Sequence, residues 1–363
     1  MAGSTFAHCG DAWGFLGRAL DSLLHGDVGG AVHLTYYAEL RAALSLLAGE
    51  GIYVGNRTHF AISSIGVQPF GGSAGTHSVA WQALQAWTDS SRSQDLLGKI
   101  IRPGGEPFAD WVDSLTAQAA RAKIDDLFRL MSLDLRKFDQ DHHRRNVVSY
   151  NPSRLHPKDM TAEQVRDLAT DVWQALEPGR SGTFPVLDDA LLPELLRSIY
   201  VSIRRKTSWS EWVAELAPAS QQGTALLSAL QASNSKTQAT GLVGAIYESR
   251  VAEVNPALYL RPMVARTVLL LRVATGSAIQ LVRESGHSST ALRPWLDSLA
   301  LSRGYWSDES PLEDALDLWA DVELAIEEAE VADVDSLHGL LRGLPTATRT
   351  FGQAERVPVW SFA

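Results

Sequence analysis

The sequence has 363 residues, of which 45% are hydrophobic and 20% are charged, and it contains eleven tryptophans. This composition excludes a disordered chain and is typical of one large or two ordinary globular domains. The single cysteine, Cys9, excludes an internal disulfide framework and a thiolate zinc site, and it favours a reducing, cytoplasmic compartment. The first residues show no charged segment followed by an apolar one, so we expect no signal peptide.

The acidic residues are concentrated in one segment. The formal charge is −10, but Asp308–Asp335 holds twelve Asp and Glu and no Lys or Arg, which leaves 30 acidic residues against 32 Lys and Arg elsewhere. The sequence therefore argues against a broad basic surface for nucleic acid, although a local basic site is compatible with it. The acidic helix predicted over Leu312–Ala329 is expected to be solvated or to dock a basic partner.

Helical periodicity dominates the N-terminal half. Apolar residues recur at steps of three and four, which is the pattern of an amphipathic helix. We predict helices over Asp11–Leu24, Ala31–Ala48, Ser78–Trp87, Phe108–Leu115 and Ala117–Ser149. Thr58–Val67 is the best strand candidate, and it leads into the glycine-rich segment Gly71–Gly75.

The C-terminal half is also predicted to be helical. Thr161, followed three residues later by Gln164, is typical of a capping box and begins a helix that ends near Leu176. Further helices are predicted over Asp188–Arg204, Trp209–Leu216, Gln221–Ala232, Ala291–Leu301 and Pro311–Glu330. Val264–Val282 is the most apolar run, but a membrane-spanning helix would rarely carry Arg272 at its centre. We therefore predict a buried core helix there and no association with a membrane.

The residues with the most potential chemistry lie in Asp139–Pro152, at the end of a predicted helix. His142, Asn146 and Tyr150 are four residues apart and share one face, and the long side chain of Arg145 reaches the same rim. An arginine among such polar groups suits a phosphate and a ribose hydroxyl.

The same residues carry a resemblance to a known family. Arg145-Asn146, three further residues and then position 150, at the end of a long helix, resemble the signature of the HEPN superfamily (higher eukaryotes and prokaryotes nucleotide-binding). His33–Leu47, with its paired Tyr36-Tyr37, also resembles an early helix of that four-to-five-helix fold. The resemblance covers roughly residues 11–152. It implies a metal-independent ribonuclease or a non-catalytic relative, often dimeric and often part of a bacterial toxin–antitoxin or anti-phage system.

The sequence departs from the family pattern at the catalytic histidine, where Tyr150 stands. A tyrosine with an ordinary pKa of about 10 is a poor general base at neutral pH, whereas a histidine is a usable one. His142 or His143 would take that role, since Arg136 and His142 also fit a loose Arg-x4–6-His spacing. The candidate catalytic residues are therefore Arg145, Asn146, Tyr150, His142 and His143.

Two further interpretations stay open for the cationic residues. Asp139–Pro152 is also compatible with a plain helix end, in which cations face the helix dipole and Asp141 pairs with Arg145. A basic trio beside Trp209 suits nucleic acid by charge and stacking, or else a solvated helix end. The candidate nucleic-acid-binding residues are Arg136, Arg144, Arg204, Arg205 and Lys206.

Two other chemistries are disfavoured. Gly71–Gly75 matches the Gly-x-Ser-x-Gly pattern of a hydrolase nucleophile, but the other strands of a parallel sheet are not evident, so a flexible loop is favoured. No pair of histidines has a convincing metal-ligand spacing, so we expect no metal and no cofactor.

The sequence thus predicts a mainly α, multi-helix protein with a HEPN-like N-terminal half, a minor β-hairpin and a helical C-terminal half. We predict domains at residues 1–157 and 158–363, or a boundary nearer 177–185 where Pro, Gly and Ser cluster. The expected function is that of a cytoplasmic component of a bacterial anti-phage defence or toxin system, which cleaves or binds RNA. The alternative is a non-catalytic scaffold or adaptor subunit of a multiprotein complex. Protein partners or a homodimer are expected.

Overall fold

The structure of the chain is a computed structural model, and helices make up most of its described part, which confirms the mainly α, multi-helix fold. The strands of that part form a single three-stranded sheet. The described residues are 1–113, 135–150, 160–179, 183–202, 208–216, 218, 220–232, 241–248, 256–307, 314–332 and 335–362.

The described N-terminal helices follow the prediction with shifted bounds, α4 and β1 are additional, and the predicted strand is divided into β2 and β3. The N-terminal elements are α1 (Ala2–Leu24), α2 (Val28–Gly49), β1 (Ile52–Val54), β2 (His59–Ser63), β3 (Gly66–Pro69), α3 (Thr76–Thr88), α4 (Ser91–Ile100), the 3-10 turn η1 (Pro103–Gly105), α5 (Phe108–Asp113) and α8 (Leu135–Tyr150). The predicted helix over Ala117–Ser149 is described from Leu135 onward, and residues 117–134 lie outside the described part.

The C-terminal elements are helices. They are α9 (Ala162–Ala175), α10 (Pro185–Ser202), α11 (Trp209–Val213), α12 (Gln221–Ala232), α13 (Gly241–Glu248), α14 (Pro256–Glu284), the 3-10 turn η4 (Ser289–Leu292), α15 (Arg293–Arg303), α16 (Asp317–Val331), α17 (Leu337–Gly343), α18 (Pro345–Phe351) and α19 (Arg356–Phe362). The capping box predicted at Thr161 is confirmed: its side chain accepts from the Gln164 amide, and the Gln164 side chain accepts from the Thr161 amide.

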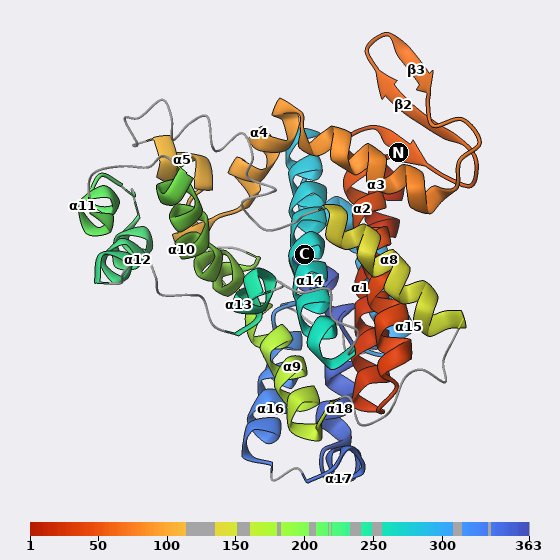
Figure 1. Cartoon of the computed structure of the whole chain (residues 1–363), viewed down its shortest axis with the longest axis vertical. Helices are drawn as coiled ribbons and strands as arrows, with labels where there is room; N and C mark the ends of the chain where they lie inside the picture. The colour runs from red at the N-terminus through yellow and green to blue at the C-terminus, as the bar shows by residue number, and fades with distance from the viewer. Residues whose placement is uncertain are drawn as a thin grey trace.

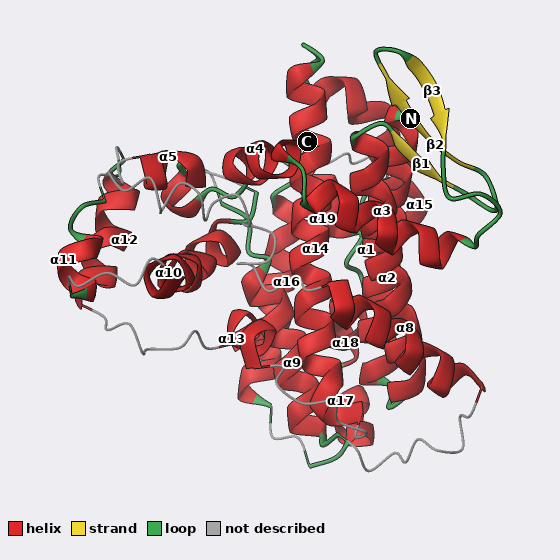
Figure 2. Cartoon of the chain, turned by 45° about the horizontal axis from the view of Figure 1, so that its top comes forward, coloured by secondary structure: helices red, strands yellow, loops and turns green. Residues whose placement is uncertain are grey.

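Three long helices form the centre of the molecule. α14 lies against both α1 and α2, and these two helices pack on each other along their lengths (Figure 1). α5, α10, α11 and α12 lie together on one side of α14, while α9, α16, α17 and α18 gather around one end of the bundle (Figures 1 and 2). One apolar core runs through both predicted segments of the chain, because α14 from the second contacts α1 and α2 from the first. The domain boundary itself stays a prediction.

α14 is the core helix that its apolar sequence predicts. Its residues from Met263 to Ala278 are buried, including Arg266 and Arg272. The segment Tyr259–Glu284 is long and apolar enough to span a membrane, but 89% of its apolar window is buried inside the fold. Each buried arginine has a buried aspartate as its partner, Asp141 for Arg266 and Asp188 for Arg272, so both charges are compensated within the protein.

The stretch predicted as one strand, Thr58–Val67, folds instead as two. β2 and β3 pair antiparallel up to Ser63 and Gly66, and a two-residue turn at Ser64-Ile65 joins them. Gly66 has a φ of +112°, which a residue with a side chain rarely adopts, so this turn depends on glycine. β1 completes the sheet on the other side of β2. The sheet is antiparallel and the Gly71–Gly75 loop follows its last strand, so this loop is no hydrolase nucleophile elbow.

We predict that Leu270→Ala destabilises the protein by about 2–5 kcal/mol, because it leaves a cavity in a fully buried position of α14. Leu324→Ala on α16 is the matched control: that side chain is 53% exposed, and its loss should change stability by less than about 0.5 kcal/mol. Equilibrium urea unfolding of both variants measures the difference. Equal midpoints would show that the Leu270 side chain is not part of the core.

Candidate functional site: histidines and tyrosines around Arg145

One face of α8 is fixed against the rest of the fold. Phe138, Asp141 and Val148 are buried, and they lie on the inward side of this helix. The Phe138 ring stacks on Trp81 of α3, with ring centroids 5.0 Å apart and planes 9° apart. The polar residues that flank this face are thereby held against α2 and α3.

Asp141 is the buried charge that attaches α8 to α14. Its side chain is fully buried, and its two oxygens accept hydrogen bonds from Arg266 of α14 and from Arg144, one turn further along α8. Arg144 also stacks over the Tyr259 ring, with its guanidinium carbon 4.6 Å from the ring centroid. The interpretation that paired Asp141 with Arg145 is therefore wrong, because both carboxylate oxygens are taken by other arginines.

A second carboxyl group, Glu39 of α2, lies next to Asp141 in the core. Burial, and then the negative charge of Asp141, raise the pKa of Glu39 well above its ordinary range and favour the neutral acid. Its Oε1 is 3.2 Å from the Thr267 hydroxyl, while Oε2 and the Nε of Arg266 are buried without a hydrogen-bond partner. The core thus holds one ionised carboxylate, one carboxyl group that favours its proton, and the Arg266 guanidinium.

Three aromatic rings from three helices meet beside this buried pair. The ring of His142 (α8) lies 5.3 Å from that of Tyr36 (α2) and 5.3 Å from that of His77 (α3), centroid to centroid, and the planes are within 22° of parallel. The Tyr36 oxygen is 2.8 Å from Nδ1 of His77. Burial raises the pKa of the Tyr36 phenol, so it keeps its proton and this contact joins a neutral phenol to the His77 imidazole.

Arg145 lies beside these rings, half-buried. Its Nη2 donates to the Tyr37 hydroxyl, its Nη1 donates to the Asn146 side-chain oxygen at 2.8 Å, and its guanidinium carbon is 5.1 Å from the Tyr37 ring centroid. Its Nε is buried and has no partner. Throughout the described ranges no carboxylate lies within ion-pair distance of this guanidinium. The positive charge of Arg145 is therefore solvated by neutral groups alone, which leaves it able to attract an anion.

Asn146 links Arg145 to His142. Because its oxygen accepts from Arg145, its amide nitrogen faces the Nε2 atom of His142, 3.4 Å away. Nε2 of His142 is then the nitrogen without a proton. A contact of 3.4 Å is longer than an ordinary hydrogen bond, so Asn146 binds the lone pair of Nε2 only weakly.

The histidines of this cluster are all biased toward the neutral form. Burial and then the charge of Arg145 lower the pKa of His142, and the same two causes in the same order lower the pKa of His33. Burial, then His142 and Arg145, lower the pKa of His77. His33 lies on α2, and its Nδ1 is 2.8 Å from the hydroxyl of Ser149 on α8. Neutral imidazoles near pH 7 are usable general bases.

The structure brings some of the predicted residues together and separates others from them. His142, Arg145 and Asn146 belong to the cluster. Tyr150 is 76% exposed and His143 is also exposed, and in the described chain neither has a hydrogen bond or ring contact with the cluster. Among the predicted nucleic-acid-binding residues, Arg144 turns inward to Asp141. Arg136 lies in α8, but its side chain is not among the described atoms. Arg204, Arg205 and Lys206 lie outside the described residues.

Sequence reasoning missed the contribution of α2 and α3. His33, Tyr36 and Tyr37 occupy one side of a helix at steps of three and four, and His77 is the second residue of α3, just after the glycine-rich loop. The α2 residues carried a weak signal, since three aromatic residues with polar atoms lie close together in a helix of mostly apolar residues. Nothing in the local sequence around His77 marks it as a partner of His142, because their contact spans 65 residues.

The chain matches no protein-family model, and the search of curated proteins and that of solved structures likewise find no match. In the part of the chain that is described, no group of three or more His, Cys, Asp or Glu side chains is arranged to hold a metal ion. The resemblance to the HEPN superfamily therefore rests on the Arg145-Asn146 motif, its position on α8 and the paired tyrosines of α2.

We predict that Asp141→Asn lowers stability by about 3–5 kcal/mol, because it removes the ionised partner of the buried Arg266. Glu39→Gln should change stability far less, since it replaces a neutral acid with a neutral amide of similar shape. In Asp141→Asn the repulsion on Glu39 disappears while its burial remains, so the pKa of Glu39 is expected to fall and Glu39 should compensate part of the unpaired Arg266 charge. The double variant should then lose more stability than the two single variants together, as urea unfolding in a double-mutant cycle would measure.

Asp139→Asn, an exposed neighbour on α8, is the matched control and should leave stability almost unchanged. Additive losses in the double-mutant cycle would contradict the coupling of Glu39 to Asp141 and Arg266.

We also predict that His142 titrates below 6.5 and that Arg145→Gln moves its pKa upward, because the variant removes the repelling charge and keeps most of the burial. NMR titration of the imidazole protons, with His142→Gln for assignment, measures this. A lowered folded-state pKa means that the unfolded chain binds more protons, so the free energy of unfolding should fall as the pH drops below about 6.5. An unchanged His142 titration in Arg145→Gln would show that this charge does not act on the imidazole.

Proposed function

We propose that the cluster around Arg145 binds the phosphodiester backbone of RNA and cleaves it. One observation carries the proposal: the half-buried Arg145 guanidinium has no carboxylate partner in the described chain, and three imidazoles surround it whose pKa values are lowered. A cation left without a counter-ion beside neutral bases suits an anionic ligand with a proton to give up. The ribose of RNA supplies such a proton on its 2′-hydroxyl, next to the phosphate.

The proposed chemistry uses two residues directly. Arg145 holds the non-bridging phosphate oxygens and stabilises the charge that develops on them in the transition state. Nε2 of His142 takes the 2′-hydroxyl proton, and the 2′-oxygen attacks phosphorus, which breaks the bond to the 5′-oxygen. The 5′-oxygen takes a proton from water, and the His142 imidazolium returns its proton to the hydroxide that remains. The products are a 2′,3′-cyclic phosphate and a 5′-hydroxyl.

The remaining cluster residues position these two. Asn146 holds Nε2 of His142 in its unprotonated form, and Tyr37 fixes the Arg145 guanidinium from the side of α2. In the proposed arrangement Tyr36 donates to Nδ1 of His77, and the Nε2–H group of His77 is then available to donate to a ribose or phosphate oxygen. The proposed base thus lies on the helix that carries Arg145, one turn before it, rather than at position 150.

The cellular role follows from the resemblance. HEPN-like sites with an arginine–asparagine motif are expected in bacterial defence and toxin systems, so we propose a cytoplasmic component of such a system that acts on RNA. Protein partners or a homodimer belong to the same proposal.

A second candidate function is a non-catalytic scaffold or adaptor subunit, and two observations favour it. The Nη groups of Arg145 are hydrogen-bonded within the protein, to Tyr37 and Asn146. The β2–β3 hairpin also exposes apolar side chains, with Ile65 81% and Val67 62% exposed, which suits contact with another protein. In that case Arg145 serves the packing of α8 on α2.

The deciding experiment measures RNA cleavage and melting temperature on the same preparations of Arg145→Ala and His142→Ala. If the site is catalytic, each variant should lose cleavage by at least about a hundredfold, because a general base alone contributes about 10²–10⁴-fold. Each should also melt within a few degrees of the parent. His287→Ala, an exposed histidine far from the cluster in sequence, is the matched control and should cleave like the parent.

The opposite pattern supports the scaffold. A parent protein that never cuts RNA, together with an Arg145→Ala variant that melts clearly lower, would retire the ribonuclease and assign Arg145 to packing. Cleavage that survives in both variants would place the activity elsewhere in the chain.

A further inference from the structure

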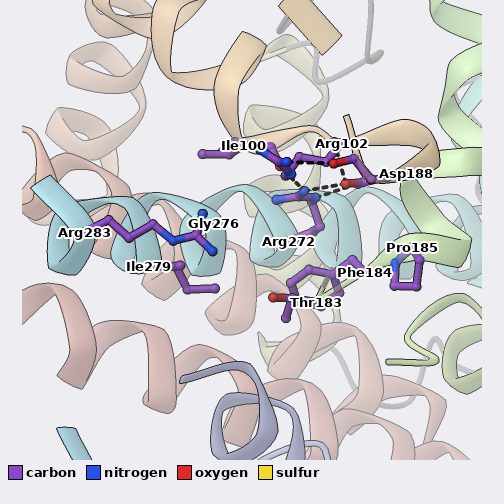
Figure 3. A pocket seen from close by; sticks show the side chains of 11 residues that line it. Ile100, Arg102, Thr183, Phe184, Pro185, Asp188, Arg272, Gly276, Ile279 and Arg283 are labelled. Atoms are coloured by element: carbon purple, nitrogen blue, oxygen red, sulfur yellow. Dashed lines mark hydrogen bonds and ion pairs between the residues drawn. The ribbon is translucent and has the colours of Figure 1, made fainter. Parts of the chain in front are cut away.

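A second site lies on the other side of α14, where the end of α4, the turn η1 and the start of α10 meet this helix (Figure 3). They enclose a pocket of about 190 Å³. For comparison, a cavity of about 150 Å³ holds a benzene molecule, so this pocket has room for a small ligand but not for a whole nucleotide. No residue of the Arg145 cluster lines it.

The pocket carries more positive than negative charge. Three arginines line it, namely Arg102, Arg272 and Arg283, and one carboxylate, Asp188. Asp188 is fully occupied, because it accepts from Nε and Nη2 of Arg272 and from the backbone amide of Arg102. With all four side chains ionised, the pocket has a net charge of about +2 in a partly enclosed space, where charges interact more strongly than in water.

The surrounding charges do not neutralise this excess. Lys99 and Glu284 are the chain neighbours of the lining residues Ile100 and Arg283, and they pair with each other at 3.7 Å. Asp189, next to Asp188, accepts from the Gly104 amide at 2.7 Å and is not part of the pocket wall.

Arg272 forms the inner wall. Its side chain is 4% exposed, and its position is fixed by Asp188, by the carbonyl oxygen of Ile100 and by the Phe184 ring, 5.3 Å from its guanidinium carbon. Nη1 is the remaining nitrogen and points toward Gly276. A Cβ atom on Gly276 would lie 2.6 Å from Nη1, so the glycine leaves the space in which this guanidinium sits.

Arg102 and Arg283 have guanidinium N–H groups that no described residue accepts. Arg102 donates from Nη2 to the carbonyl oxygen of Gly105 at 2.7 Å, which uses one of its five guanidinium N–H groups. The Arg283 side chain runs along α14 toward Gly276 (Figure 3), and within the described residues it has no ion pair and no hydrogen bond. Three guanidinium groups thus border one small space, and two of them have unused N–H groups.

We propose that this pocket binds a phosphate group, either as free orthophosphate or as the end of a small phosphate monoester. A dianion matches the net charge of the pocket, and arginine N–H groups pair with phosphate oxygens two at a time. Thr183 at the rim offers a hydroxyl to a further oxygen. The bound group would join α14 to the segments just before η1 and α10, which carry Arg102 and Thr183, through one set of hydrogen bonds. This proposal stands independently of the proposed RNA cleavage.

The test is calorimetric titration of the full-length protein at constant ionic strength, with orthophosphate, glycerol phosphate and acetate as three separate probes. Orthophosphate or glycerol phosphate should bind at a stoichiometry of one, and the tighter of the two identifies the source of the phosphate group. Arg283→Gln should weaken this binding by about tenfold or more, the loss of one charge-assisted contact. The affinity of Arg283→Lys for phosphate should lie between that of Arg283→Gln and that of the parent.

Melting curves check that the loss is specific. Without phosphate, Arg283→Gln should melt like the parent, because this exposed side chain has no partner to lose. Phosphate should raise the melting temperature of the parent and of Arg92→Gln, an exposed arginine outside the pocket, and should raise that of Arg283→Gln less. Phosphate also stabilises proteins by exclusion from their surface, and that effect is common to the parent, Arg92→Gln and Arg283→Gln. The difference between their melting temperatures therefore reports specific binding.

Three results would overturn the proposal. The first is that neither phosphate probe binds, and the second is that acetate binds as tightly as orthophosphate. The third is that Arg283→Gln binds orthophosphate as tightly as the parent does.

Discussion

The buried ion pair between Asp141 and Arg266 determines where α8 lies, and the candidate site depends on it. An unpaired charge in this core would cost several kcal/mol, so α8 must rest with Asp141 against Arg266. His142 and Arg145 follow Asp141 by one and four residues, so the same contact sets them beside Tyr36 and Tyr37 of α2. Glu39 adds a second carboxyl group to the pair and is itself part of α2. The core charges therefore connect all the helices that meet at the cluster except α3, which is held by Trp81 and Phe138.

The sequence predicts the fold class well because helical periodicity is local. The run Val264–Val282 is recognised as a core helix from its composition and from Arg272, which a lipid-facing helix would exclude. The partners of the arginines in this helix could be identified only from the structure. Nothing near Arg272 in sequence marks Asp188, 84 residues away, as its partner. A minor hairpin was predicted, but Thr58–Val67 was taken as a single strand because the turn at Ser64-Ile65 lacks the usual Asn-Gly or Asp-Gly signal, and only Gly66 marks the reversal.

The candidate site was predictable only in part, and for a physical reason. The motif at Arg145 is contiguous on one helix, so the spacing of His142, Arg145 and Asn146 could be read from helix geometry. The residues that tune it come from α2 and α3, and these contacts depend on how the helices pack. The prediction that Asp141 pairs with Arg145 used the same local rule and was wrong, because Arg144, three residues along α8, takes one oxygen of Asp141 and Arg266 of α14 takes the other.

α14 supports both sites, and its two buried arginines explain how. Arg266 and Arg272 are six residues apart, which is about 240° around a helix, so they face different neighbours, α8 and α10. A rotation or a one-turn slide of α14 would break both pairs at once, and each break would leave a charge buried without a partner. Apolar residues in their place would serve stability equally well but would allow other registers of α14. The charges thus fix one register, and that register holds α8, which carries His142 and Arg145, on one side and leaves Nη1 of Arg272 beside Gly276 of the pocket wall on the other.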